Sequence, residues 1–262
     1  MTVEEALRGS AIDAREARLL LAFATGLSEA AVAAFPEVPL PAAAESAFGS
    51  FIERRRAGEP IAYILGRKEF YSLDLAVTPE VLIPRPETEL LVELALRLAP
   101  SSVLDLGTGS GAIALAIKKH LPAARVTAVE ASAAALEVAR RNAVRHALEV
   151  ELFYGNWFSP VAGRTFDVVV SNPPYVAAGD PHLAGLAHEP AEALVCGRDG
   201  LDAIREIART APPHLAHGGW LLVEHGLGQE DAVKALFHAA GLEEVQAWPD
   251  LAGIPRVTGG RR

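Results

Sequence analysis

Cysteine is almost absent from this chain of 262 residues, and Cys196 is the single example. One thiol cannot form an internal disulfide, and such cysteine usage is typical of a reducing compartment. The first residues carry neither a basic segment nor an apolar one, so nothing there resembles a secretory signal. A run of about 18 apolar residues is also absent, so the sequence predicts no membrane-spanning helix. We therefore expect a cytoplasmic protein without a membrane partner.

Positive charge is scarce as well. The 24 Lys and Arg residues face 33 Asp and Glu residues, for a formal net charge of −9. Binding of duplex nucleic acid depends on clustered lysine and arginine, so this balance argues against a stable nucleic-acid partner, although it leaves room for a local basic patch. His214 and His217 lie close in sequence, but no third ligand accompanies them, and we expect no metal site. We expect the chain to act as a monomer.

Half of the residues are hydrophobic, which is enough for a sizeable core. Residues 1–66 have the apolar spacing of a small helical bundle, with Asp13 and Ser28 placed as helix N-caps. Residues 67–84 change to the alternation of short strands and predict a β-hairpin linker. The remaining residues, 85–262, are expected to form one α/β domain.

Strands and helices alternate through this third part, after a helix expected at 86–98. We predict helices at 112–120, 133–145, 201–215 and 229–240, and strands at 103–106, 125–129, 150–153, 166–170, 220–224, 243–248 and 255–259. Such alternation predicts a mostly parallel, doubly wound sheet covered by helices on both faces. The loop at 176–200 is longer than most connections, so we expect it to have a function.

A glycine-rich loop ends the first strand of this sheet and opens the next helix; it consists of Gly107, Thr108, Gly109, Ser110 and Gly111. Glycine permits positive φ and close approach of a ligand, and the helix N-terminus offers free N–H groups. Glu130 ends the second strand, where a carboxylate can accept hydrogen bonds from both hydroxyls of a ribose. Together they predict an adenosine-type ligand. With Ala112 the loop also satisfies the G-x-G-x-x-A fingerprint, so a nicotinamide cofactor stays open on the loop alone, as does a glycine turn without a ligand.

A second polar group, Ser171-Asn172-Pro173-Pro174-Tyr175, follows a buried strand of three valines. Its position at the carboxyl end of a strand is where open α/β sheets bind ligands. The two prolines fix φ, lack N–H groups and bias the residues before them towards extended backbone. The segment should therefore be stiff, with carbonyl oxygens that meet few competing donors and with an aromatic ring at its end. Such a surface can hold a planar NH2 group; a rigid Pro-Pro turn that caps the strand is the alternative interpretation.

Taken together, these motifs resemble those of a known family. The glycine loop with Asn172-Pro173-Pro174-Tyr175 resembles the class I methyltransferases that alkylate planar nitrogens. Further matching segments make the whole chain look like the release-factor glutamine methyltransferases, the PrmC/HemK family; they are Ile83-Pro84-Arg85-Pro86-Glu87-Thr88-Glu89, Asn156-Trp157-Phe158, Glu189-Pro190 and Gly197-Arg198-Asp199-Gly200-Leu201. The resemblance implies a Rossmann-like fold and methyl transfer from S-adenosylmethionine, with S-adenosylhomocysteine as product. The implied acceptor is the side-chain amide nitrogen of the glutamine in the Gly-Gly-Gln loop of class 1 peptide-chain release factors.

The resemblance also implies roles for single residues. The glycine loop from Gly107 to Gly111 and Glu130 would hold the cofactor, with Asn156 and Trp157 near its adenine. Glu130 and Asn156 both stand where the family commonly has Asp, which puts the adenine contact of Asn156 in doubt. Asn172 would border cofactor and substrate. Asn172, Pro173 and Tyr175 would carry the chemistry, and they would bind the substrate together with Pro174 and Arg85.

Two points stay open at this level. Arg85 lies between two prolines, either as a solvated linker charge or as part of an arm across the mouth of the catalytic domain. An adenine or guanine methyltransferase acting on a nucleic acid is the alternative function, because an exocyclic amine is also a planar NH2 group and base flipping would present it. A nucleotide-binding module without catalysis is a third interpretation.

Overall fold

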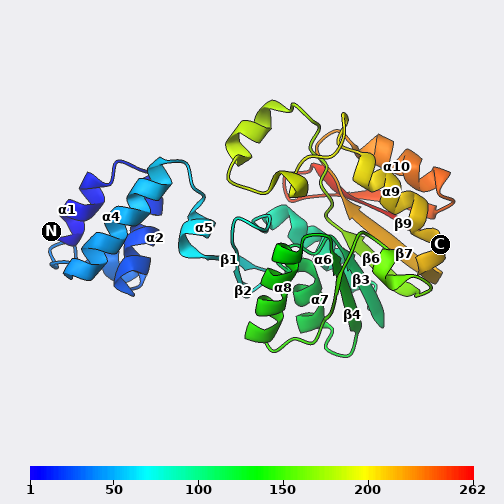
Figure 1. Cartoon of the computed structure of the whole chain (residues 1–262), viewed down its shortest axis with the longest axis horizontal. Coiled ribbons are helices and arrows are strands. Elements are labelled where there is room, and N and C mark those ends of the chain that lie inside the picture. The colour runs from blue at the N-terminus through cyan, green and yellow to red at the C-terminus, as the bar shows by residue number, and fades with distance from the viewer. The chain divides into compact units, whose positions relative to one another are not determined.

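The computed structural model describes all 262 residues, and the chain forms two compact units, Met1–Arg67 and Lys68–Arg262. The first unit is built of five helices, which are α1 (Val3–Gly9), α2 (Ala14–Thr25), α3 (Glu29–Ala34), α4 (Ala42–Arg56) and α5 (Ile61–Leu65) (Figure 1). Asp13 and Ser28 cap α2 and α3 as the sequence predicts. The sequence analysis did not single out α1, although Thr2 and Glu5 form a capping box at its start. Leu20, Leu21 and Phe48 lie in the core of this bundle.

The second unit contains a hairpin of β1 (Arg67–Phe70) and β2 (Leu73–Ala76). Tyr71 and Ser72 form its turn with φ of 46° and 62°, in the left-handed region. The side chain of Asn142 bonds both the N–H and the carbonyl of Ala76, at 2.7 and 3.0 Å, and so attaches the hairpin to α8 (Ala133–Arg145). A 3₁₀ turn (Pro86–Thr88) and α6 (Glu89–Arg97) follow, where the sequence predicts one continuous helix.

Seven strands form the main sheet in the order β5-β4-β3-β6-β7-β9-β8. Their bounds are β3 (Ser102–Leu106), β4 (Arg125–Glu130), β5 (Glu151–Tyr154), β6 (Phe166–Ser171), β7 (Leu215–Glu224), β8 (Glu243–Pro249) and β9 (Pro255–Arg261). The first five strands in this order pair in parallel, and β9 pairs antiparallel with both β7 and β8. The chain thus has the mostly parallel α/β sheet that the alternation predicts.

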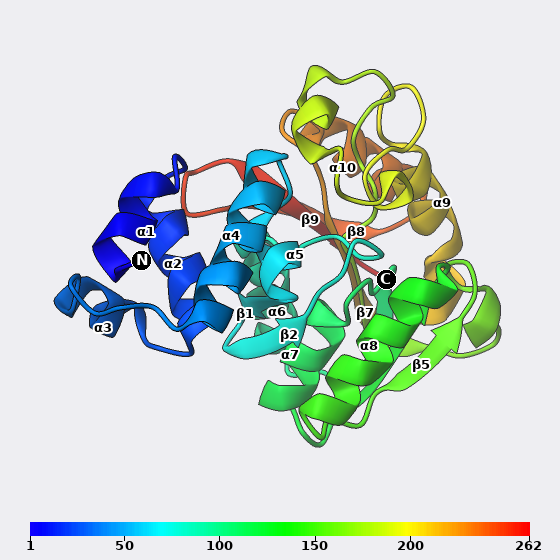
Figure 2. The ribbon, with the colours of Figure 1, turned by 60° about the vertical axis from the view of Figure 1, so that its left-hand side comes forward.

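Helices cover both faces of this sheet. On one face, α6, α8 and α7 (Ala112–His120) pack over one set of alternating strand residues, represented by Val103 and Val168. On the other face, α9 (Asp202–Thr210) and α10 (Glu230–Ala239) pack over the intervening set, represented by Leu104 and Val169. Figures 1 and 2 show α7 and α8 on one side of the sheet and α9 and α10 on the other. Because successive side chains of a strand point to opposite faces, both sets are apolar and the strands read as continuous hydrophobic runs.

The boundary between α9 and β7 differs from the prediction. The helix expected at 201–215 ends at Thr210, and the strand expected at 220–224 already begins at Leu215. Pro212 and Pro213 explain the early end, because proline cannot donate the N–H that the helix needs. The loop at 176–200 is also more ordered than expected of a plain connection; it contains two 3₁₀ turns, Pro181–Leu186 and Ala191–Ala193, and a bridge between Val176 and Val195.

Neither a membrane helix nor a metal cluster is found in the structure. None of the helices combines the length and apolar character needed to cross a bilayer. No three His, Cys, Asp or Glu side chains gather in a way that could hold a metal ion. His214 stacks on Phe158 with ring centroids 4.6 Å apart, and its Nδ1 lies 3.0 Å from the Arg164 carbonyl. The Sγ of Cys196 accepts the N–H of Ala203 at 3.1 Å. The side chains of His214 and Cys196 are therefore both engaged in contacts within the fold.

Candidate active site

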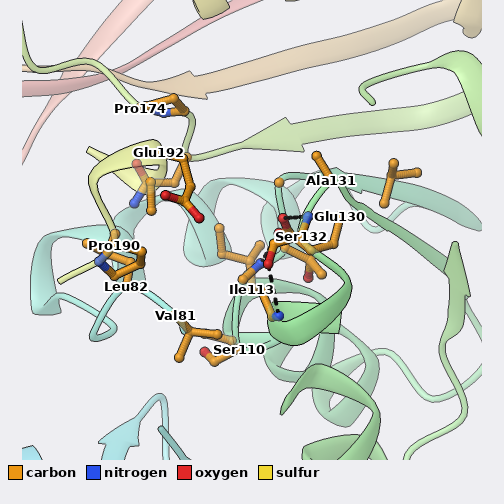
Figure 3. A pocket seen from close by; sticks show the side chains of 18 of the residues that line it. Val81, Leu82, Ser110, Ile113, Glu130, Ala131, Ser132, Pro174, Pro190 and Glu192 are labelled. Atoms are coloured by element: carbon orange, nitrogen blue, oxygen red, sulfur yellow. Dashed lines mark hydrogen bonds between the residues drawn. The ribbon is translucent and has the colours of Figure 1, made fainter. Parts of the chain in front are cut away.

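A cavity of about 500 Å³ opens at the carboxyl ends of β3, β4 and β6 (Figure 3). Many of the residues expected to bind a ligand line it; they are Gly107, Thr108, Gly109, Ser110, Glu130, Asn156, Trp157, Asn172, Pro174 and Arg85. Gly111, Pro173 and Tyr175 do not line this cavity. The carboxyl edge of a parallel sheet thus brings the glycine loop and the Asn-Pro-Pro-Tyr segment to one site.

The glycine loop owes its shape to positive φ at Gly107, Gly109 and Gly111, which have φ of 72°, 55° and 85°. A side chain at Gly109 would meet no atom within 4 Å, so the space beside its backbone belongs to the cavity. The N–H groups of Gly107 and Thr108 donate to the Val129 carbonyl at 2.9 and 3.1 Å and hold the loop against β4. The backbone is therefore set for close approach by a ligand.

Glu130, the last residue of β4, is held by backbone donors from two sides. One carboxylate oxygen accepts the N–H of Gly109 at 2.8 Å, and the other accepts the N–H of Ser132 at 2.9 Å. Figure 3 shows Glu130 and Ser132 together on one side of the cavity. Each carboxylate oxygen has a second lone pair, so both oxygens can still accept hydroxyl donors from a ligand.

Asp105 lies beneath the loop on β3 and is completely buried. Its Oδ2 accepts the Thr108 hydroxyl at 2.6 Å and the Ala114 N–H at 3.2 Å, whereas its Oδ1 has no partner. Burial raises the pKa of Asp105 to about 7, against the opposing effect of the two hydrogen bonds. The sequence analysis did not single out this carboxyl, because an acidic residue inside an apolar strand carries no separate signal.

Trp157 stands beside the glycine loop in an unusual backbone conformation, with φ of 45°. A Cβ built on Gly107 would lie 3.6 Å from a carbon of the Trp157 ring, an ordinary van der Waals contact, so the ring packs against the loop at this glycine. Gly155, with φ of 154°, allows the turn before it, because a Cβ there would come within 2.3 Å of Pro160. The indole thus forms part of the cavity wall next to Asn156.

Asn172 follows β6 and faces the cavity. Its Nδ2 donates to the Thr88 hydroxyl at 3.1 Å, across 84 positions of the chain. Ser171, just before it, donates from its buried hydroxyl to the Leu106 carbonyl at 2.8 Å and holds the end of β6 against β3. The backbone carbonyl of Pro173 accepts no hydrogen bond from the chain. Asn172 therefore offers the cavity an amide oxygen held in orientation by Thr88, whereas the unbonded Pro173 carbonyl belongs to a residue outside the cavity lining.

Tyr175 turns away from the cavity towards the end of β7. Its hydroxyl donates to Glu224 at 3.3 Å, and its carbonyl accepts the Gln229 side-chain N–H at 3.0 Å. Burial raises the pKa of the Tyr175 hydroxyl, and the nearby Glu224 carboxylate raises it further. Burial likewise raises the pKa of Glu224 to about 7. The sequence analysis did not identify Thr88 or Gln229 as partners of the motif.

Arg85 forms an ion pair with Glu189 of the long loop. The Glu189 side chain is only 3% exposed, and its second oxygen accepts the N–H of Ile83 at 3.0 Å. One buried carboxylate therefore fastens the segment around Arg85 to a loop more than one hundred residues later. The guanidinium is neither a free solvated charge nor unpartnered, and it still lines the cavity.

Carboxylates dominate the charge of the cavity. Glu80, Glu130 and Glu192 line it, against Arg85 as the one cation, and Glu189 already neutralises that cation. Figure 3 shows the Glu192 carboxylate turned into the cavity, opposite Glu130 and Ser132. Such a site favours a ligand with net positive charge and disfavours a pyrophosphate. This charge balance weighs against the nicotinamide cofactor that the glycine loop alone left open.

The fold and the site together define a Rossmann-like methyltransferase of class I. Residues 86–192 match the model of the methyltransferase small domain, and residues 2–66 match the PrmC N-terminal domain. A release factor glutamine methyltransferase of Xylella fastidiosa (strain Temecula1) is 49% identical to this chain over 257 residues, which cover 95% of this chain and 94% of the relative. The chain belongs to the family of release factor glutamine methyltransferases.

Solved structures agree with the fold. A methyltransferase from Pyrococcus furiosus is 22% identical, with a TM-score of 0.59 over 81% of this chain and 96% of that one. The rRNA N2 G1207 methyltransferase RsmC of T. thermophilus, solved with AdoMet and guanosine, is also 22% identical, with a TM-score of 0.56 over 75% of this chain and 49% of that one. The Rossmann-like prediction is thereby confirmed.

Proposed function

We propose that the chain transfers the methyl group of S-adenosylmethionine to the side-chain amide nitrogen of the glutamine in the Gly-Gly-Gln motif of class 1 peptide-chain release factors. Membership of the family supports the acceptor class, because the relatives are named for release factor glutamine. The observation that carries the proposal is Asn172, whose amide faces the same cavity as the glycine loop and is oriented by Thr88.

The residues of the cavity fit this cofactor. S-adenosylmethionine carries a sulfonium and an ammonium against one carboxylate, so its net charge is positive, as the acidic lining requires. It also needs no pyrophosphate cradle. When bound, it supplies a methyl group on a positively charged sulfur. RsmC, of the same fold, was solved with AdoMet.

Each wall of the cavity then has a role towards the cofactor. The glycine loop from Gly107 to Gly111 would take the methionine portion, because its backbone is open to close approach. Glu130 would accept the ribose hydroxyls with the lone pairs that Gly109 and Ser132 leave available. Trp157 would lie against the adenine, with Asn156 next to it.

The acceptor nitrogen needs help from the protein, because the lone pair of a primary amide is delocalised into its carbonyl. The Oδ1 of Asn172 would accept one N–H of the substrate amide and the carbonyl of Pro173 the other. Both acceptors bind more strongly as positive charge develops on the nitrogen, so they favour the transition state over the ground state. Holding the NH2 group in place also removes the entropy cost of finding the reactive geometry.

Proton removal needs no dedicated base in this scheme. The methylated amide nitrogen is briefly cationic and therefore acidic enough to lose a proton to water. Tyr175 lies outside the cavity and would support the amide site by fixing the end of the motif, and its hydroxyl stays protonated because burial raises its pKa. Pro174 and Arg85 would contact the peptide that carries the glutamine, and the bundle at residues 1–66 would recognise the release factor itself.

Labelling tests the proposal directly. The protein would be mixed with methyl-labelled S-adenosylmethionine and either a class 1 release factor or its variant with the Gly-Gly-Gln glutamine changed to alanine. We expect label on the first and none on the second. Label on both factors, or on neither while the cofactor binds, would contradict the proposal. A parallel reaction with added nucleic acid tests the alternative, because label on the nucleic acid would favour a base-methylating enzyme.

A further inference from the structure

Thr88 is the last residue of the 3₁₀ turn that leads into α6, and its backbone is helical, with φ of −67° and ψ of −18°. An N-cap threonine accepts an N–H of the first helical turn, but it does so from a non-helical backbone that Thr88 does not have. Here the hydroxyl makes no such bond, although the residue is only 4% exposed. Its oxygen instead accepts the Nδ2 of Asn172 at 3.1 Å. This buried hydroxyl accepts a hydrogen bond from a side chain 84 positions away, which indicates a requirement at that side chain.

That requirement concerns which way the Asn172 amide points. The oxygen and the NH2 group of asparagine are nearly equal in size, so packing alone does not distinguish the two orientations and the hydrogen-bond network decides. An acceptor at Thr88 selects the orientation in which NH2 faces Thr88 and Oδ1 faces away from it. With the opposite orientation, the group offered to a substrate NH2 would be a donor.

Glu224 contacts the other end of the same motif, at Tyr175. It ends β7, is 1% exposed, and accepts the Tyr175 hydroxyl at 3.3 Å. The Thr88 hydroxyl lies close enough to lower the pKa of this carboxyl, yet Oε2 accepts no well-formed hydrogen bond. Thr88 uses a lone pair for Asn172, which leaves its hydroxyl hydrogen available to the unfilled Oε2 of Glu224. Arg256 and Glu87 are the other charged groups that act on this carboxyl.

We propose that Thr88 and Glu224 are positioning residues, which turn the Asn172 oxygen towards the substrate amide and fix Tyr175 at the other end of the motif. The proposal rests on the proposed function for its catalytic consequence. Its structural content, the orientation of Asn172, stands independently of which substrate is methylated. Thr88 lines the cavity and Glu224 does not, and in this proposal both act through Asn172 and Tyr175.

Replacement of Thr88 tests this. Thr88→Val keeps the shape and removes the acceptor, Thr88→Ser keeps the hydroxyl, and Thr127→Val removes an equally buried hydroxyl on β4, away from the cavity. The full-length variants would be compared by methyl transfer to a release factor, by S-adenosylmethionine binding, and by the side-chain amide NMR signals of isotope-labelled Asn172, assigned by their loss in Asn172→Ala.

In Thr88→Val we expect kcat to fall about tenfold or more, while KM and the cofactor Kd change less than about threefold. The Asn172 signals should shift in this variant and stay close to wild type in Thr88→Ser, which should regain most of the rate. Thr127→Val should change neither kcat nor the Asn172 signals. Unchanged Asn172 signals in Thr88→Val would overturn the proposal, as would equal losses in the valine and serine variants. If wild type fails to methylate the factor, the proposed function fails and the NMR signals still decide the positioning role.

Discussion

The two sides of the cavity are held in different ways. On the cofactor side, Glu130 accepts the backbone N–H groups of Gly109 and Ser132, and Asp105 accepts the N–H of Ala114 in α7 together with the Thr108 hydroxyl. On the substrate side, Asn172 and Tyr175 are bound mainly by the side chains of other elements, represented by Thr88 and Glu224. The glycine loop keeps its shape as long as its backbone keeps its φ values. A network of side chains depends on every member, so a single substitution can disturb it without unfolding the protein.

This difference separates binding from chemistry. Substitutions on the cofactor side should act on affinity for S-adenosylmethionine, and those on the substrate side should act on the rate of transfer. The predictions below test that separation, from the largest expected effect to the smallest.

Asn172→Ala should give the largest effect. It removes the oxygen that we propose accepts the substrate N–H, and loss of one such acceptor costs about 100-fold or more in kcat at comparable electrostatic sites. The cofactor side is untouched, so Kd for S-adenosylmethionine should stay within about threefold of wild type. Methyl-transfer kinetics and titration calorimetry measure the two quantities. A parallel loss of affinity would show that the two sides are not separable.

Glu224→Gln should change how stability depends on pH. The pKa of Glu224 is raised from 4.5 to about 7 in the folded state, so between these values the native protein holds a proton that the unfolded chain releases. Stability contributed by this group is present at low pH and lost as pH rises through 7, by about 2 kcal/mol between pH 5 and pH 7.

Glutamine cannot titrate, so the variant should not lose this part of its folding stability as pH rises from 5 to 7. Asp105, whose pKa is also raised to about 7, is present in both proteins and cancels in the comparison. Urea unfolding of both proteins at a series of pH values measures the difference. Parallel curves would mean that Glu224 does not hold a proton in the folded state.

Glu130→Ala should show the opposite pattern to Asn172→Ala. It removes the acceptor for the ribose and for the N–H groups of Gly109 and Ser132, so S-adenosylmethionine should bind about tenfold more weakly. At saturating cofactor, kcat should fall by less than about threefold. A large fall in kcat with unchanged affinity for S-adenosylmethionine would show that Glu130 acts on methyl transfer and not on cofactor binding.

Glu192→Gln should give the smallest effect. This exposed carboxylate faces the cavity and attracts a cationic ligand only through solvent-screened charge. We expect about a twofold loss of cofactor affinity at low salt. The loss should vanish when added salt screens the charge. A salt-independent loss would instead indicate a direct contact between Glu192 and the cofactor.

The sequence predicts the cofactor side far better than the substrate side. Gly107 to Gly111 and Glu130 belong to one strand-loop-helix-strand unit, where spacing alone places them together. The partners of Asn172 and Arg85 lie 84 and 104 positions away, and no local pattern connects them. Glu189 was part of a recognised motif, yet its ion pair with Arg85 follows only from the fold.

Element boundaries show the same limit. The alternation of strands and helices predicted the parallel sheet, because both faces of each strand are buried and the apolar runs are long. The end of α9 was placed too late although Pro212 and Pro213 stand just after it. Helix α1 was not predicted, since seven residues give too short a periodic signal and only its capping box marked it.

The bridge made by Glu189 also bears on the order in which the molecule folds. The bond between Glu130 and Gly109 closes a loop of 21 positions, whereas that between Glu189 and Arg85 closes one of 104. Closing the longer loop costs about 1.4 kcal/mol more in chain entropy, because the cost grows with the logarithm of loop length. The glycine loop can therefore form early, from neighbouring elements. We expect the Glu189 bridge to form later than the glycine loop, so that the substrate side of the cavity takes shape after the cofactor side.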